Sequence, residues 1–158
     1  MQIATLTTIK KELQHLSHDE LMALCLRLGR FKKENKALLT YLLFEAHDEA
    51  GYIESVKQTI DQEFKSINTA SYFYMKKTIR KILRQIRTFN RYSLNKATEV
   101  ELLLYFCEKL NAITPSIHNY RTLSNLYERQ IESIKKKITA LHEDLQYDYN
   151  QILNDIKH

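Results

Sequence analysis

Four arginines of this chain are spaced to lie on one face of a helix, where they could bind an anion. They follow one another at intervals of four, three and four residues: Arg80, Arg84, Arg87 and Arg91. Residues three or four apart project from the same side of a helix. A guanidinium group binds phosphate or carboxylate through two parallel hydrogen bonds and stacks on flat rings. Three lysines extend or widen the predicted anion-binding face: Lys76, Lys77 and Lys81.

The segment that contains these arginines has no acidic residue. From Phe64 to Thr98 the chain has nine Lys or Arg and no Asp or Glu, whereas its total net charge is +5. A cation excess this local favours an anionic partner. Interleaved aromatics such as Phe73 and Tyr74 are typical of surfaces that stack single-stranded bases. Nucleic acid, as RNA or another single strand, is therefore the partner that we expect.

An acidic stretch just upstream permits a different interpretation of the same face. Its members all lie in 45–63: Glu45, Asp48, Glu49, Glu54, Asp61 and Glu63. If the two segments pack as antiparallel helices, the acids could neutralise the arginines within the molecule. An anionic membrane surface is a further partner that suits a basic amphipathic helix. The sequence leaves open whether the arginines face solvent or the acids.

Residues that could ligate a metal or catalyse a reaction are sparse. Glu12 and His15 have the i, i+3 spacing of di-iron bundles, but such a site needs a second motif and two further carboxylates. Asp155 and His158 form the only other pair of this kind, at the end of the chain. There is no glycine-rich phosphate loop. We expect a non-enzymatic binding protein that uses no metal and no cofactor.

Composition restricts the fold to helices. The chain has two Gly and one Pro in 158 residues, too few turn residues for a fold rich in strands. Its apolar runs are too short to cross a bilayer, and its start has no signal-type apolar region. Cys25 and Cys107 lie far apart within apolar runs, which favours free thiols. These features predict a cytoplasmic protein with no integral membrane association.

Apolar periodicity predicts about six short helices in a domain spanning 1–114. Segment 71–92 should form one of them, with its apolar stripe opposite the arginines. Segment 98–110 is apolar on nearly every side and should be the central helix. Segment 31–46 has a wide apolar face and should be well buried.

Helix starts are expected at three sites of capping chemistry. Ser17 and Thr98 each precede a Glu by three residues, as in a capping box. Thr114 precedes Pro115, which suits the first position of a helix. The last of these starts would open the C-terminal segment.

Residues 115–158 are predicted to form one long coiled-coil-like helix. At 1.5 Å per residue, a helix over 116–158 would be roughly 64 Å long. Its apolar seam follows a heptad pattern with one stutter: Ile131, Ile134, Ile138, Leu141, Leu145, Tyr149 and Ile152. This seam would pack on its own domain, on a second copy in a homodimer, or on another helical protein. A protein–protein adaptor or a self-assembling scaffold is therefore the alternative function.

These elements favour an all-α bundle, and an α-solenoid-like stack of helical hairpins is the alternative. The segments KKENKALLTYLLFEA (32–46), YMKKTIRKILRQIRTFNRYS (74–93) and TEVELLLYFCEKL (98–110) resemble small bacterial all-helical proteins of uncharacterised function. The resemblance covers roughly residues 15–112. It implies a helical domain over that range and no site residue.

Overall fold

The computed structural model describes residues 1–157, and all regular elements in that range are helical. The α-helices are α1 (Leu6–Leu13), α2 (His18–Phe31), α3 (Lys33–Thr40), α4 (Glu49–Lys65), α5 (Tyr72–Ser93), α6 (Lys96–Ala112), α7 (Arg121–Ile138) and α8 (Glu143–Lys157). Two short elements are the π-helical η1 (Tyr41–Glu45) and the 3-10 helix η2 (Ile117–Asn119). The predicted all-α class is confirmed.

Contacts divide the chain into two compact units, Met1–Phe44 and the part from Glu45 onward. The boundary expected at 114/115 lies inside the second unit, between α6 and α7. The two units differ in how much apolar surface they bury.

The first unit consists of α1, α2 and α3, and it buries little apolar surface. The predicted capping box at Ser17 is confirmed: its Oγ accepts from the Glu20 N–H at 3.2 Å, and its N–H donates to the Glu20 carboxylate at 2.7 Å. The prediction that segment 31–46 is well buried is wrong. Its side chains Leu43 and Phe44 are 68% and 65% exposed. Three short helices form no second layer that could cover this face.

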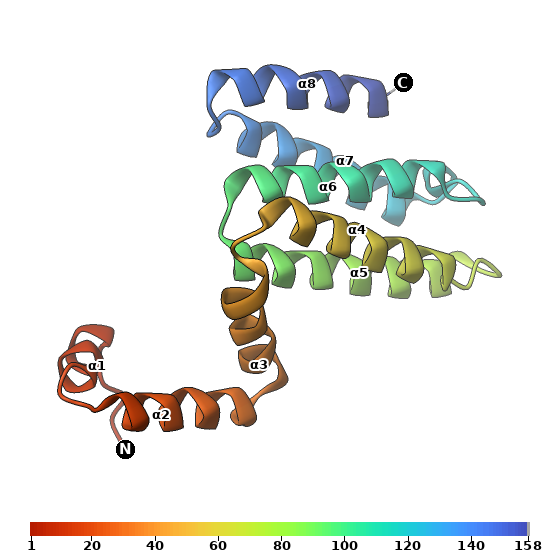
Figure 1. Ribbon diagram of the computed structural model, residues 1–158. Helices are drawn as coiled ribbons and strands as arrows, with labels where there is room; N and C mark the ends of the chain where they lie inside the picture. Colours follow the sequence, from red (N-terminus) through yellow and green to blue (C-terminus); the bar gives the residue numbers. More distant parts are fainter. Residues whose placement is uncertain (158) are drawn as a thin grey trace. The chain divides into compact units, whose positions relative to one another are not determined.

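The second unit packs its helices around α6, as the sequence predicted. Helix α6 contacts α4, α5, α7 and α8, and Figure 1 shows it between the α4–α5 pair and the α7–α8 pair. Its buried apolar side chains lie on several sides of the helix: Val100, Leu102, Leu103, Leu104, Phe106, Cys107 and Leu110. The helix begins earlier than expected, since Asn95 caps it and Thr98 lies inside it. No capping box therefore forms at Thr98.

The C-terminal segment is two helices and not the expected single long one. Residues 115–120 include η2 and no α-helix, so Thr114 does not start a helix. Helix α7 ends at Ile138, and α8 begins at Glu143 after a short turn. Both helices contact α6 and each other. The chain therefore uses part of its apolar seam as its own core.

Individual residues of that seam differ in burial. Ile131, Ile134 and Ile138 are buried in α7, whereas Leu145 and Ile152 of α8 are exposed. Leu141 is partly buried in the turn. Tyr149 is also partly buried, and burial beside the Glu101 carboxylate raises its pKa to about 12. Helix α8 buries Leu153 and Ile156 in the core, whereas Ile152 of the predicted seam is exposed.

Candidate functional site

Helix α5 holds its four arginines on a solvent-facing side. Ser71 caps the helix by accepting from the Tyr74 N–H. The side chains of Arg80, Arg84, Arg87 and Arg91 are exposed. The opposite face of the helix is buried: Met75, Ile79, Ile82, Leu83 and Ile86. The core stripe and the arginine stripe thus occupy the separate faces that the spacing predicted.

The acidic stretch 45–63 does not pair with these arginines. Among residues 1–157, no carboxylate oxygen lies within 4.0 Å of the four guanidinium groups, and Glu63 pairs with Lys81 at 3.2 Å. The arginines face solvent, which answers the question that the sequence left open. Of the seven predicted anion-binding residues, Lys81 is the one that forms an ion pair with this stretch in residues 1–157.

Two other acids of the stretch, Glu49 and Asp61, are held by residues of α5 and α6. Asp61 accepts from Lys109 at 2.9 Å and from the Tyr105 hydroxyl at 2.7 Å. Burial acts to raise the pKa of Asp61, but these hydrogen bonds outweigh it and the pKa lies below its usual value. Glu49 accepts from the hydroxyls of Ser93 and Thr98. Glu49 and Asp61 therefore stabilise the packing of α4 against α5 and α6.

A hollow of about 530 Å³ lies between α5 and α7, and we call it the arginine hollow. Helix α5 lines it with Arg80, Leu83, Arg84 and Arg87, and helix α7 lines it with Thr122, Asn125, Leu126, Arg129 and Gln130. Four arginines from two helices therefore surround one space. No acidic side chain is part of its lining. Such an arrangement suits a phosphate or carboxylate.

A second hollow of about 360 Å³ adjoins the first, and we call it the amide hollow. Both hollows are lined by Arg87 and Gln130, and together they form the α5/α7 groove. The remaining lining residues come from α5, α6, α7 and the α5–α6 turn: Asn90, Arg91, Leu94, Asn95, Glu99, Leu103, Ser133 and Lys137. Glu99 pairs with Lys137 at 2.8 Å, so these two charges compensate each other. The uncompensated charges of the groove are its five arginines.

Two buried amides belong to the lining of the amide hollow. Asn90 and Gln130 are each 7% exposed. Neither the amide nitrogen nor the amide oxygen of Asn90 has a hydrogen-bond partner among the described residues. Buried polar atoms without partners are rare in folded proteins, so the Asn90 amide calls for an explanation.

The structure brings together only part of the predicted anion-binding face. Arg80, Arg84, Arg87 and Arg91 line the groove, whereas the three predicted lysines do not. Lys76 lies 5.8 Å from the centre of the Phe73 ring, and Lys77 is exposed outside the lining. The groove adds residues that we did not predict: Asn90, Arg129, Gln130 and Lys137. Arg129 and Lys137 are eight residues apart on α7, about 80° around the helix, so their spacing alone does not reveal a shared face.

Exposed aromatic side chains lie near one end of the arginine stripe. Phe73 is seven residues before Arg80, which places the two on the same side of α5. Phe73 and Tyr74 are exposed and meet edge to face at 5.6 Å between ring centres. Tyr72, in contrast, stacks on Tyr120. Two of the predicted aromatics are therefore available to a ligand.

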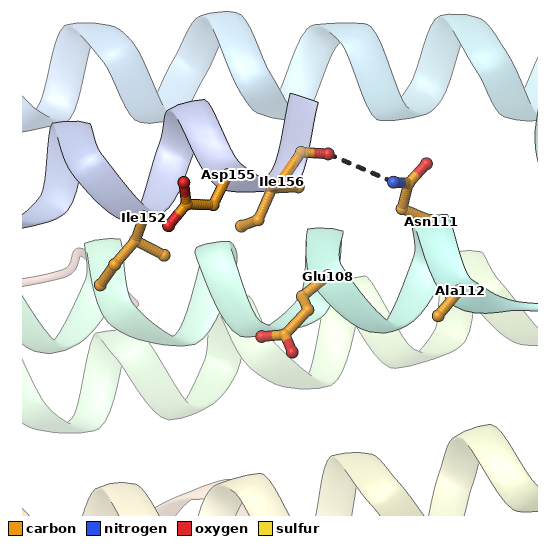
Figure 2. Close-up of a pocket in the computed structure, with 6 residues that line it drawn as sticks. All are labelled: Glu108, Asn111, Ala112, Ile152, Asp155 and Ile156. Atoms are coloured by element: carbon orange, nitrogen blue, oxygen red, sulfur yellow. Dashed lines mark hydrogen bonds between the residues drawn. The ribbon is translucent and has the colours of Figure 1, made fainter. Parts of the chain in front are cut away.

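A third hollow, of about 430 Å³, lies between α6 and α8 (Figure 2). Its lining includes the carboxylates Glu108 and Asp155 on different helices, beside Ile152 and Ile156. The Asn111 amide donates to the Ile156 carbonyl at 3.2 Å and ties the two helices together. The carboxylates give this hollow the opposite charge to the α5/α7 groove.

No group of three or more His, Cys, Asp or Glu in residues 1–157 is placed to hold a metal ion. The pair Glu12 and His15 stands alone in that range, and the pair that includes His158 lies outside the described residues. In the same range, no helix is long and apolar enough to cross a membrane.

Comparisons with protein-family models, with curated proteins and with solved structures found no match. These comparisons therefore identify no family for the chain. The resemblance over residues 15–112 does not identify one either.

Proposed function

We propose that this protein is a non-enzymatic binding protein that holds single-stranded nucleic acid, such as RNA, in the α5/α7 groove. The observation that carries the proposal is the arginine hollow, where four guanidinium groups and no acid line one space. Phosphate contacts supply most of the sequence-independent affinity for nucleic acid. Arginine is the side chain best suited to make them.

The length of the arginine stripe favours a strand over a single small anion. Arg80 and Arg91 are eleven residues apart, which corresponds to about 16 Å along a helix. A single phosphate would contact only part of this length, whereas a strand presents phosphates in succession. Phe73 and Tyr74 at one end of α5 offer rings on which bases can stack.

The size of the groove favours a single strand over a duplex. Its hollows of about 530 and 360 Å³ have the capacity of small-ligand pockets. Individual nucleotides fit such spaces, while a paired duplex keeps its bases stacked inside. Recognition of unpaired bases is also the usual way in which proteins bind RNA specifically.

The adaptor or scaffold function has less support. It relied on a free C-terminal seam, but Ile131, Ile134 and Ile138 are buried within the chain. Only the α8 part of the predicted seam, with Leu145 and Ile152, is exposed.

Fluorescence anisotropy with a labelled nine-residue oligouridine tests the proposal. If four phosphates are contacted, affinity should fall about fifty-fold between 50 and 200 mM salt, because each contact releases counterions. The double variant R84E/R87E should lose more than about a hundred-fold in affinity while its circular dichroism stays unchanged. Both positions are exposed, so the fold should tolerate the change.

The matched control is K10E/K11E, which changes the net charge by the same amount at two exposed positions of α1. Its affinity should stay within about threefold of the wild type, because long-range charge effects are screened by salt. Binding that does not depend on salt, or equal losses in the two double variants, would contradict the proposed function.

A further inference from the structure

The amide hollow differs in chemistry from the arginine hollow beside it. It contains two buried amides and the carboxylate of Glu99, which lies 2.8 Å from Lys137. A carboxylate disfavours phosphate at close range but accepts hydrogen bonds from an amino group. The exposed Leu94 and the buried Leu103 add apolar surface to the lining. This combination suits the flat ring and polar edge of a nucleobase.

Asn90 supplies the strongest indication of a ligand. A side-chain amide has two N–H donors and a carbonyl oxygen with two acceptor sites. In Asn90 these atoms are buried and have no partner among the described residues. Leaving such a group unpaired is costly, and native proteins rarely do so without a functional reason. Gln130, a residue that is also 7% exposed, brings a second side-chain amide to the lining of the same hollow from α7.

We infer that Asn90 and Gln130 recognise an adenine base when a strand occupies the groove, an inference that rests on the proposed function. An Asn or Gln amide pairs with adenine through two hydrogen bonds, donating to a ring nitrogen and accepting from the amino group. The Glu99 carboxylate can accept from the second amino hydrogen. Uracil has no amino group, so it cannot donate a hydrogen bond from such a group to the Glu99 carboxylate. The arginine hollow then holds the neighbouring phosphates.

The inference assigns different roles to the two hollows. Arg80, Arg84 and Arg129 position the strand without regard to sequence, and the two amides decide which base enters beside Arg87. Phosphate contacts position a strand, and base contacts specify it. Substitution of the arginines should therefore lower the affinity for every strand. Substitution of the amides should lower the affinity only for strands that carry the recognised base.

The test compares oligouridine of nine residues with the same strand carrying one central adenosine. Both strands have the same phosphates, so the ratio of their affinities isolates the base. The wild type should prefer the adenosine strand by about tenfold or more. Asn90→Leu and Gln130→Met keep the approximate side-chain volume but remove the amide, and each should reduce the preference to below about twofold. In each variant the affinity for the adenosine strand should fall more than the affinity for plain oligouridine, because the amide contacts the base.

Each result supports or overturns the inference. Salt-dependent binding of both strands with equal affinity would overturn base recognition and leave the proposed function standing. A preference that survives in both amide variants would overturn the role of these residues. If Asn90→Leu does not fold, Gln130→Met carries the test, because its amide approaches the hollow from a different helix. Loss of all binding in R84E/R87E, with base preference lost only in the amide variants, is the supporting pattern.

Discussion

Cys25 and Cys107 differ in access to solvent, the property that decides whether a thiol reacts. Cys25 is exposed on α2, whereas Cys107 is fully buried in α6. Burial raises the pKa of the Cys107 thiol to about 12. The thiolate is the reactive form, so Cys107 is both inaccessible and protonated at neutral pH. We predict that the native protein reacts with one equivalent of a thiol reagent such as DTNB, at Cys25.

A second equivalent should react only after unfolding in denaturant. Mass spectrometry of the labelled native protein should place the label on Cys25, and Cys25→Ser should abolish native labelling. Labelling of native Cys107 at a comparable rate would show that the α6 core opens readily, contrary to its burial.

The groove residues separate into those that sequence spacing reveals and those that it does not. Arg80 and Arg84 were predicted because charged residues three or four apart on an amphipathic helix must share a face. Asn90 was not predicted, because it lies on the buried side of α5, where helical periodicity indicates core and no binding site. Arg129 and Gln130 were missed because their contribution depends on how α7 packs beside α5. Packing between distant segments is a tertiary property that helical periodicity does not contain.

Charge at the helix ends explains why the C-terminal segment breaks where it does. Helix α7 ends with Lys135, Lys136 and Lys137, and α8 begins with Glu143 and Asp144. Cations at a helix C-terminus and acids at an N-terminus are both favoured by the helix dipole. The turn is also held by Gln146, whose amide donates to the Leu141 carbonyl at 2.7 Å. This charge pattern is visible in the sequence, but the heptad seam by itself predicts one continuous helix.

Helix α8 should stabilise the molecule through its inner face. Leu153 is 2% exposed against the core, and its neighbour Ile152 is 42% exposed. We predict that Leu153→Ala lowers the free energy of unfolding by about 2–5 kcal/mol, because it leaves a cavity. Ile152→Ala, the matched control, should cost about 1 kcal/mol or less. Urea denaturation followed by circular dichroism measures both.

The same pair of variants tests the homodimer that the seam suggested. A dimer built on the predicted seam would make Ile152 the more costly substitution. The urea midpoint would also rise with protein concentration, since association stabilises the folded state by mass action. A midpoint independent of concentration, with the larger loss at Leu153, is the result expected of a monomer that uses α8 as core.

At the scale of the whole molecule, the two units contribute unequally to stability. In Met1–Phe44 only Tyr41 is buried, while the second unit contains the buried faces of α4 to α8. The helices of the first unit have 8, 14 and 8 residues. Isolated helices this short are marginal in water. Cooperative unfolding should therefore be a property of the second unit.

We predict that a fragment starting at Glu45 folds by itself and keeps the binding properties of the full chain. All residues of the α5/α7 groove lie in the second unit, so its affinity for oligouridine and its salt dependence should match the full protein within about threefold. A peptide of residues 1–44 should show weak helicity by circular dichroism. A fragment that folds but no longer binds would place the nucleic-acid site elsewhere. A fragment that does not fold would show that the second unit depends on the first for its stability.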